Sequence, residues 1–167
     1  MKLAYLAIAA IFVGVRVALY ATSSQIEVTK TFTSTRFAAP AWKVLTDFES
    51  IPKWNSRVLE ARLLSKEPAR AGTQFTELRK GLFSASTMTF TVEQIGNNRL
   101  VVAGKDGSTR VDFDYTLDEG PAGSSIRLHF VESPTPLLLS MVLTPLYSRV
   151  IDGNVEQLRA LIEAASP

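Results

Sequence analysis

The sequence predicts an α+β fold in which one curved antiparallel sheet wraps around a long C-terminal helix. Three patterns lead to this prediction: two short proline-led helices after a first strand, alternating apolar residues in six further strands, and helical spacing in the C-terminal segment. At 167 residues the chain has room for one such domain and a short additional segment.

The first strand and the two short helices come early in the chain. Residues 26–34 alternate apolar and polar side chains, which is typical of a strand with one buried face. Pro40 suits the first turn of a helix, where a missing N–H costs nothing. The apolar stripe of that helix, at i, i+3, i+4 and i+7 spacing, consists of Ala41, Val44, Leu45 and Phe48. Pro52 then begins a second helical turn that carries Trp54, and we expect Asp47 to cap or anchor the loop between the helices.

Six strands follow, because the apolar period changes to two from Arg57 onwards. Gly96-Asn97-Asn98 and Asp106-Gly107 are turn sequences that connect neighbouring strands. The clearest alternation places four residues on one face: Val111, Phe113, Tyr115 and Leu117. Asp112, Asp114 and, on the next strand, His129 fall on the opposite, solvated face. Successive hairpins with one apolar face predict an antiparallel meander with one side covered.

The cover is the C-terminal helix. Its apolar residues recur at helical spacing and are Leu146, Tyr147, Val150, Ile151, Val155, Leu158, Leu161 and Ile162. The helix ends near Ala164 and begins at Leu137 or at Leu146, because Pro145 can either kink a helix or start one. Gly153 inside it costs about 1 kcal/mol relative to alanine. The preceding segment, "PTPLLLSMVLTPLY", is more apolar than one side of a surface helix requires.

The N-terminal segment has the composition of a membrane span. Residues 3–21 are apolar or small apart from Arg16, and as a helix they would measure roughly 28 Å, close to the thickness of a bilayer core. Arg16 lies near the end, where its side chain can reach the headgroups. We expect residues 1–24 to be an uncleaved anchor, with a signal peptide cut after Ala21 or a buried core helix as alternatives.

Residues 25–167 then form the folded domain. Lys2 at the amino end favours a cytoplasmic N-terminus and an extracytoplasmic domain. Cleavage of the leader would instead give a secreted or periplasmic protein. Either way, we expect residues 3–21 to direct the chain to a membrane.

Charge and composition exclude several classes of function. The chain has 18 basic and 16 acidic residues; Lys2 and Arg16 precede residue 25, so residues 25–167 hold 16 of each. Without a basic run, nucleic acid is not an expected partner. No cysteine and one histidine argue against disulfides, thiolate sites and zinc. No phosphate-binding loop or serine elbow is present, and we expect neither a metal nor a cofactor.

This order of elements resembles the START-like (SRPBCC) superfamily with its helix-grip fold, whose bacterial branches include polyketide cyclase/dehydrase proteins. The segments that carry the resemblance are "APAWKVLTDFESIPKWN" (39–55), "AGTQF" (71–75) and "DYTL" (114–117), within about residues 25–165. Within the first segment the matching residues are Ala39, Pro40, Val44, Leu45, Asp47, Phe48, Pro52 and Trp54. The resemblance implies a hydrophobic cavity between sheet and helix that receives lipids, polyketides, quinones or hormones. It says little about catalysis, since only a minority of members are enzymes.

Glu77 and Arg79 are the polar candidates for such a cavity, because they share a strand face with Phe75. If Phe75 points inward, the two form an ion pair that orients the polar group of a ligand. The alternative is a twisted or edge strand that leaves both charges in water. Tyr115 offers an interior hydroxyl, although tyrosines in sheets mostly serve packing.

Three functional hypotheses remain open. The first is a START-like domain that binds, transports or presents a hydrophobic small molecule or lipid near a membrane. The second is an aromatase, cyclase or dehydratase-like enzyme that uses Glu77, Arg79 or Tyr115, although we assign no catalytic residue. The third is a non-catalytic interaction domain whose own side chains fill the cavity, which cavity volume would reveal. The expected ligand-binding residues are Trp54, Phe75, Glu77, Arg79, Phe90, Phe113, Tyr115, Leu139, Leu143 and Tyr147.

Overall fold

The computed structural model describes residues 23–65, 68–81 and 84–165. Its elements follow in the predicted order of strand, two short helices, six strands and long helix. They are β1 (Ser23–Ser34), α2 (Ala38–Thr46), the 3-10 helix η1 (Phe48–Lys53), β2 (Val58–Leu63), β3 (Gln74–Lys80), β4 (Ala85–Gly96), β5 (Arg99–Asp106), β6 (Thr109–Gly120), β7 (Gly123–Pro136) and α3 (Leu137–Ala164). The predicted α+β class is confirmed.

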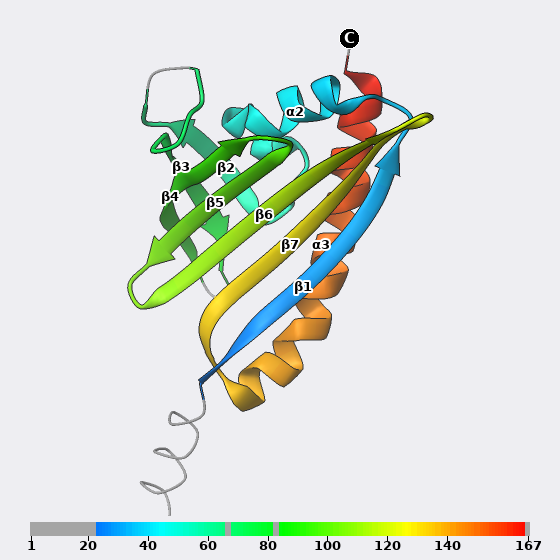
Figure 1. Cartoon of the computed structure of the whole chain (residues 1–167). Coiled ribbons are helices and arrows are strands. Elements are labelled where there is room, and N and C mark those ends of the chain that lie inside the picture. Colours follow the sequence, from blue (N-terminus) through cyan, green and yellow to red (C-terminus); the bar gives the residue numbers. More distant parts are fainter. Residues whose placement is uncertain (1–22, 66–67, 82–83, 166–167) are drawn as a thin grey trace, which may run out of the picture.

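The seven strands form one antiparallel sheet in the order β1-β7-β6-β5-β4-β3-β2. The strands from β2 to β7 pair with their neighbours along the chain, whereas β1 pairs with β7 from the other end of the sequence. Figure 1 shows the sheet curving around α3, with α2 at one end. A curved sheet closed around one long helix is the helix-grip arrangement that the sequence predicts.

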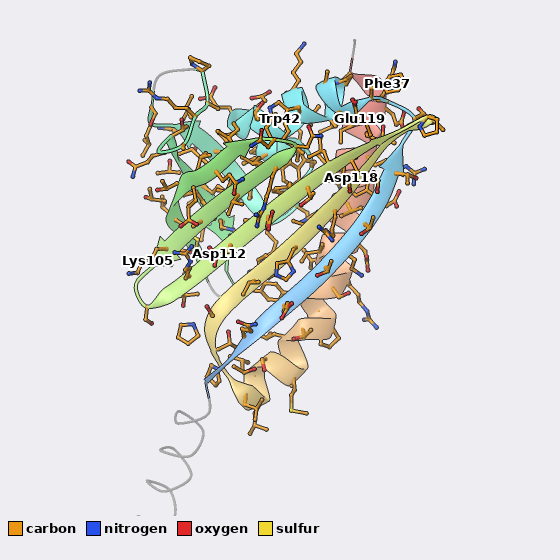
Figure 2. The ribbon with its side chains drawn as sticks, in the orientation of Figure 1. Phe37, Trp42, Lys105, Asp112, Asp118 and Glu119 are labelled. Atoms are coloured by element: carbon orange, nitrogen blue, oxygen red, sulfur yellow. The ribbon has the colours of Figure 1, made fainter. Side chains whose placement is uncertain are left out.

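β6 shows how the sheet separates the interior from solvent. Of the four side chains that the alternation places on the covered face, Val111, Tyr115 and Leu117 are buried, and Phe113 is partly buried against the core. Asp114 faces outward and accepts two hydrogen bonds from Arg99, at 2.6 and 3.0 Å. Figure 2 shows Asp112 near the turn between β5 and β6, close to Lys105. The two aspartates therefore serve the outer surface of the sheet, as predicted.

α2 packs its apolar stripe into the interior, where Ala41 and Leu45 are buried. Its first N–H groups lack a local side-chain cap, because the residue before the helix is Phe37. Glu119 on β6 compensates, since its carboxylate accepts a hydrogen bond from the Ala38 N–H at 2.9 Å. Figure 2 shows Phe37 and Glu119 at the same end of the molecule. A strand distant in sequence thus fixes the start of α2.

The loop between α2 and η1 differs in one detail from the prediction for Asp47. Asp47 does precede η1, but its carboxylate makes no capping hydrogen bond. Its main-chain oxygen instead accepts hydrogen bonds from the N–H of Ser50 at 3.0 Å and from the Ser50 hydroxyl at 2.8 Å. The main chain of Asp47, and not its carboxylate, therefore holds the loop between α2 and η1.

The second half of α3 holds the helix against the sheet. Its buried residues are Ile151, Asn154, Val155, Leu158 and Ile162. Lys30 on β1 forms an ion pair with Asp152 at 2.7 Å. Further along, the Glu163 carboxylate accepts hydrogen bonds from the Thr35 N–H at 2.7 Å and the Ser34 hydroxyl at 2.9 Å. Contacts from β1 and from the loop after it therefore hold α3 at two positions, Asp152 and Glu163.

The first half of α3 is much less covered. The helix begins at Leu137 and contains Pro145, so of the two predicted starting points the earlier one is correct. Only Ser140 is buried in this half. Six apolar side chains here are 42% to 67% exposed, and we call them the apolar start of α3: Leu137, Leu138, Leu139, Met141, Val142 and Leu146.

Among the helices of the described residues, none combines the length and the apolar character that a membrane crossing requires. The predicted anchor, residues 3–21, lies outside the described residues, as does the alternative cleavage point after Ala21. Anchor, signal peptide and extracytoplasmic location therefore stay predictions.

Candidate functional site

A row of aromatic rings crosses the interior from η1 to α3. Successive ring centroids lie 4.4 to 6.0 Å apart, within the range of contacting aromatic pairs. The row consists of Phe48, Phe75, Phe90, Phe113, Phe130 and Tyr147. Gly104 on β5 makes room for it, because a Cβ at this position would overlap the ring of Phe90. The rings occupy much of the space between the sheet and the helices.

A small cavity remains beside this row. Its volume is about 20 Å³, which is room for about one water molecule. Pockets that hold small molecules usually measure about 300–1,000 Å³. The wall consists of Leu45, Phe48, Ile51, Trp54, Asn55, Phe75, Glu77, Phe90, Leu100, Val102, Phe113 and Tyr115. In this conformation the protein's own side chains nearly fill the interior, as the third hypothesis requires.

Two polar atoms on the cavity wall lack a hydrogen-bond partner. They are Trp54 Nε1, a donor, and Glu77 Oε2, an acceptor, on residues that are 6% and 3% exposed. Across the described residues no other buried side-chain nitrogen or oxygen is left unpaired. An unpaired buried group of this kind costs about 1–3 kcal/mol. The cavity wall therefore offers one hydrogen-bond donor and one acceptor to a polar group.

The environment of Glu77 changes its acidity. Burial raises the pKa of Glu77 to about 7, and the neighbouring Arg79 guanidinium opposes this rise. Arg79 Nε lies 3.5 Å from Glu77 Oε2, and both side chains are mostly buried, so the strand adopts the inward arrangement of the two considered. A carboxyl group with a pKa near 7 can donate or accept a proton at neutral pH. Burial, reinforced by Glu77, also raises the pKa of Tyr115.

Arg79 lines a second, outer pocket of about 180 Å³. Its guanidinium carbon lies 5.6 and 5.7 Å from the ring centres of Phe90 and Phe113, which both line the inner cavity. The same side chain lines the outer pocket together with Arg57 and Tyr147, and the Arg57 guanidinium lies 4.8 Å from the Tyr147 ring centre. Arg79 thus lines the outer pocket and contacts two rings of the inner cavity wall.

The structure brings most of the predicted site residues together. Those on the inner cavity wall are Trp54, Phe75, Glu77, Phe90, Phe113 and Tyr115. Arg79 and Tyr147 line the outer pocket, and Leu143 packs against the core without lining either space. Leu139 lies apart from the site and is 46% exposed, because α3 buries itself against the core mainly in its second half.

Sequence reasoning missed a buried polar link beside the cavity. Asn154 on α3 donates a hydrogen bond to Asn55 at 3.1 Å and accepts one from the Ser56 N–H at 3.0 Å. The available signal was Asn154 itself, since a polar residue within the apolar stripe of a helix requires a partner. Sequence reasoning also did not assign five apolar residues to the cavity wall: Leu45, Phe48, Ile51, Leu100 and Val102.

A larger surface groove, of about 490 Å³, lies where the end of β1, the turn between β6 and β7, and the end of α3 meet. Hydrogen bonds from Thr35 and Ser34 lower the pKa of Glu163 in this groove and fix its carboxylate. Neither of the unpaired buried atoms found in the described chain lies here. We therefore place the candidate site at the inner cavity.

Metal chemistry has little support in the residues that the structure describes. No three of their histidine, aspartate and glutamate side chains are grouped so that they could hold an ion. His129, the sole histidine of the sequence, faces outward, where its Nδ1 lies 2.9 Å from the Thr29 hydroxyl. Any chemistry at the cavity would depend on Glu77, Arg79 and Tyr115.

Comparison with known protein families gives one match. The family described as "Polyketide cyclase / dehydrase and lipid transport" matches residues 25–163. The match begins in β1 and ends in the last turn of α3, and so contains every residue of the candidate site. A search of curated proteins finds no match.

Solved structures share the fold at low sequence identity. The di-domain ARO/CYC StfQ from the steffimycin biosynthetic pathway has a TM-score of 0.68 at 12% identity; the alignment covers 84% of this chain and 51% of StfQ. This chain thus spans about half the length of StfQ. The Zhui aromatase/cyclase from Streptomyces sp. R1128 gives 0.69 at 12%, covering 84% and 94% of the two chains. A START superfamily protein from Mycobacterium smegmatis gives 0.61 at 15%, covering 83% and 94%. At these identities the likeness shows the fold alone.

Proposed function

The chain belongs to the polyketide cyclase / dehydrase and lipid transport family, and from this premise we propose that it binds a hydrophobic small molecule or lipid between the sheet and α3. The observation that carries the proposal is a pair of buried atoms without a hydrogen bond, Trp54 Nε1 and Glu77 Oε2, on an otherwise mostly apolar wall. A ligand would place one polar group, such as a hydroxyl, between them. Its apolar part would lie along the aromatic row, where burial of apolar surface favours binding.

Binding requires the interior to open, because the inner cavity holds only about 20 Å³. The outer pocket adds about 180 Å³ once Arg79 turns away from the rings of Phe90 and Phe113. A ligand then selects and stabilises this more open conformation. The closed conformation, with its nearly filled interior, is then the conformation of the ligand-free protein.

The proposal includes a membrane location. Residues 3–21 would hold the domain at a bilayer, with the domain on the extracytoplasmic side. Hydrophobic ligands partition into the bilayer, so an attached domain meets its ligand at a high local concentration. If the leader is cleaved instead, the same domain works as a secreted or periplasmic binding protein.

Native mass spectrometry of the full chain, extracted from its own membranes in detergent, tests this function. We expect an added mass from a bound hydrophobic molecule, and the chain mass also reports whether residues 1–24 are retained. The delipidated protein should then take up at least one of a fatty acid, a quinone or a polyprenol.

The combined substitution Trp54→Phe with Glu77→Gln should weaken that uptake, because it removes the donor and the carboxylate together. Asp112→Asn on the outer face is the matched control and should bind like the wild type. Failure of the delipidated wild type to take up any of the three classes would overturn the proposal.

A second candidate is an aromatase, cyclase or dehydratase-like enzyme. Burial raises the pKa of Glu77 to about 7 within the cavity, as general acid–base catalysis requires, and two proteins of similar fold are an aromatase/cyclase and an ARO/CYC. In such a reaction Glu77 would pass a proton to or from the substrate, while Tyr115 would donate a hydrogen bond. Turnover of an aromatic polyketide precursor that survives Glu77→Gln and Tyr115→Phe unchanged would exclude this candidate.

A further inference from the structure

The apolar start of α3 exposes neighbouring apolar side chains to solvent. Its six side chains are 42% to 67% exposed and follow one another within ten residues of the helix. No charged residue occurs between Glu132 and Arg149. Ordinary surface helices place charged and polar residues on their solvent side, and exposed apolar patches of this kind mark interaction sites.

The shape of the patch bears on its partner. On a helical wheel of about 100° per residue, the six side chains spread over roughly 200° of the helix circumference. A partner helix covers a narrower stripe, as in the seams of coiled coils. A broad apolar surface around a helix end is better suited to a fluid apolar solvent such as the interior of a bilayer.

The position of the patch points to the same partner. Ser23, the first residue of β1, pairs with Pro136, the residue immediately before α3. Paired residues of antiparallel strands lie about 5 Å apart, so the first turn of α3 begins beside the first residue of β1. Figure 1 shows β1 beginning next to the first turns of α3 at one end of the molecule.

Only Thr22 separates Ser23 from the apolar segment of residues 3–21. With so short a connection, a membrane-spanning segment at residues 3–21 would hold this end of the domain against the bilayer surface. The patch, indicated by exposure, therefore lies at the same end of the fold as Ser23, where the chain joins the span that composition predicts.

We propose that the apolar start of α3 is a membrane-contact surface that inserts its leucines, Met141 and Val142 among the lipid acyl chains. Arg149, exposed just over one turn beyond Pro145, then lies at headgroup level. Tyr147 lies between these two positions and lines the outer pocket, so the outer pocket lies near the lipid. This inference concerns a surface distinct from the interior site and does not require ligand binding there.

Site-directed fluorescence tests the contact, and the absence of native cysteines makes labelling specific. Met141→Cys and, as a matched control on the exposed side of the same helix, Glu156→Cys are introduced separately into the full chain. Each is labelled with an environment-sensitive dye and reconstituted into vesicles of phosphatidylcholine and phosphatidylglycerol. We expect emission at position 141 to shift to shorter wavelength and to be quenched by doxyl-labelled acyl chains, whereas position 156 stays accessible to aqueous iodide.

Two results would overturn the proposal. In the first, the dye at position 141 is quenched by iodide as strongly as the dye at position 156, so the patch faces water. In the second, iodide and doxyl lipids both fail to quench it, so protein covers the patch. Disulfide crosslinking of the unlabelled Met141→Cys variant then identifies the covering protein: a crosslinked dimer indicates a second copy of the chain, and its absence indicates residues 3–21. Ligand uptake by the unlabelled wild type is measured separately, so failure of either proposal leaves the other interpretable.

Discussion

At the scale of single residues, Glu77 links the stability of the fold to pH. Its pKa rises from 4.5 to about 7, chiefly because burial disfavours the charged carboxylate. Between these pH values the folded protein retains a proton that the unfolded chain has released. The contribution of Glu77 is therefore most favourable below pH 4.5, decreases as the pH rises towards 7, and is constant above that. The decrease amounts to roughly 3 kcal/mol, at about 1.4 kcal/mol per pKa unit.

Glu77→Gln should remove this dependence. We expect its free energy of unfolding, measured by urea denaturation, to change less between pH 4.5 and pH 8 than that of the wild type, by on the order of 3 kcal/mol. Glu156→Gln on the exposed side of α3 leaves the buried carboxyl in place and should keep the wild-type profile. Equal pH profiles for Glu77→Gln and wild type would show that the carboxyl titrates as if it were in water.

At the scale of elements, two glycines have opposite roles. A Cβ added at Gly153 in α3 would meet open space, whereas a Cβ at Gly104 on β5 would overlap the ring of Phe90. We expect Gly153→Ala to raise the free energy of unfolding by about 1 kcal/mol, because alanine loses less backbone entropy in a helix. Gly104→Ala should lower it by about 1–3 kcal/mol, because the aromatic row must shift.

Thermal or chemical denaturation of the two variants measures both effects, and each serves as the control for the other. A stabilising Gly104→Ala would mean that the aromatic row has free space beside it. A destabilising Gly153→Ala would mean that the helix is distorted at that position.

The elements that the sequence predicts well are those with a repeated local pattern. Alternation in β4 and β6 identifies both strands and their inward faces, and therefore places Phe90, Phe113 and Tyr115 in the interior. The start of α3 could not be chosen, because Pro145 is compatible with a helix start and with a helix interior. The Glu119 cap on α2 joins residues 81 positions apart, and no local pattern reveals such a pair.

The candidate site is likewise predictable only where a local pattern exists. Periodicity indicates that Phe75, Glu77 and Arg79 share a face, but not that the Arg79 guanidinium lies over the rings of Phe90 and Phe113. The volume depends on the conformers of a dozen side chains from several elements, which sequence alone does not fix. Leu139 was expected at the site because it belongs to an apolar helix, yet helical spacing does not tell how far the core extends along that helix.

At the scale of the whole molecule, the proposed opening of the interior depends on Arg79, which contacts the rings of Phe90 and Phe113. Its two contacts with aromatic rings contribute about 0.5–1 kcal/mol each. Arg79→Ala removes both. If Arg79 is the gate that we propose, the variant should lower the barrier to ligand entry by about 1.4 kcal/mol, which is about tenfold in rate. Stopped-flow fluorescence with the apolar probe N-phenyl-1-naphthylamine measures the entry rate.

Arg62→Ala is the control for this experiment, because the Arg62 side chain is 73% exposed and forms an ion pair with Glu60 at the surface. It should leave the entry rate unchanged. An Arg79→Ala variant that admits the probe no faster than wild type would show that another part of the molecule limits entry.

The pairing of β1 with β7 constrains how the chain folds. Thr29 faces His129 across this pair, so the contact closes a loop of 100 residues, whereas the strands from β2 to β7 join through hairpins. Local hairpins form early and long-range pairings form late, because closing a long loop costs more chain entropy. A nascent chain is also made from its N-terminus, so β1 leaves the ribosome first and finds its partner last. Until β7 and α3 have been synthesised, β1 is an unpaired strand next to the predicted anchor, and completion of the sheet is the step most exposed to misfolding.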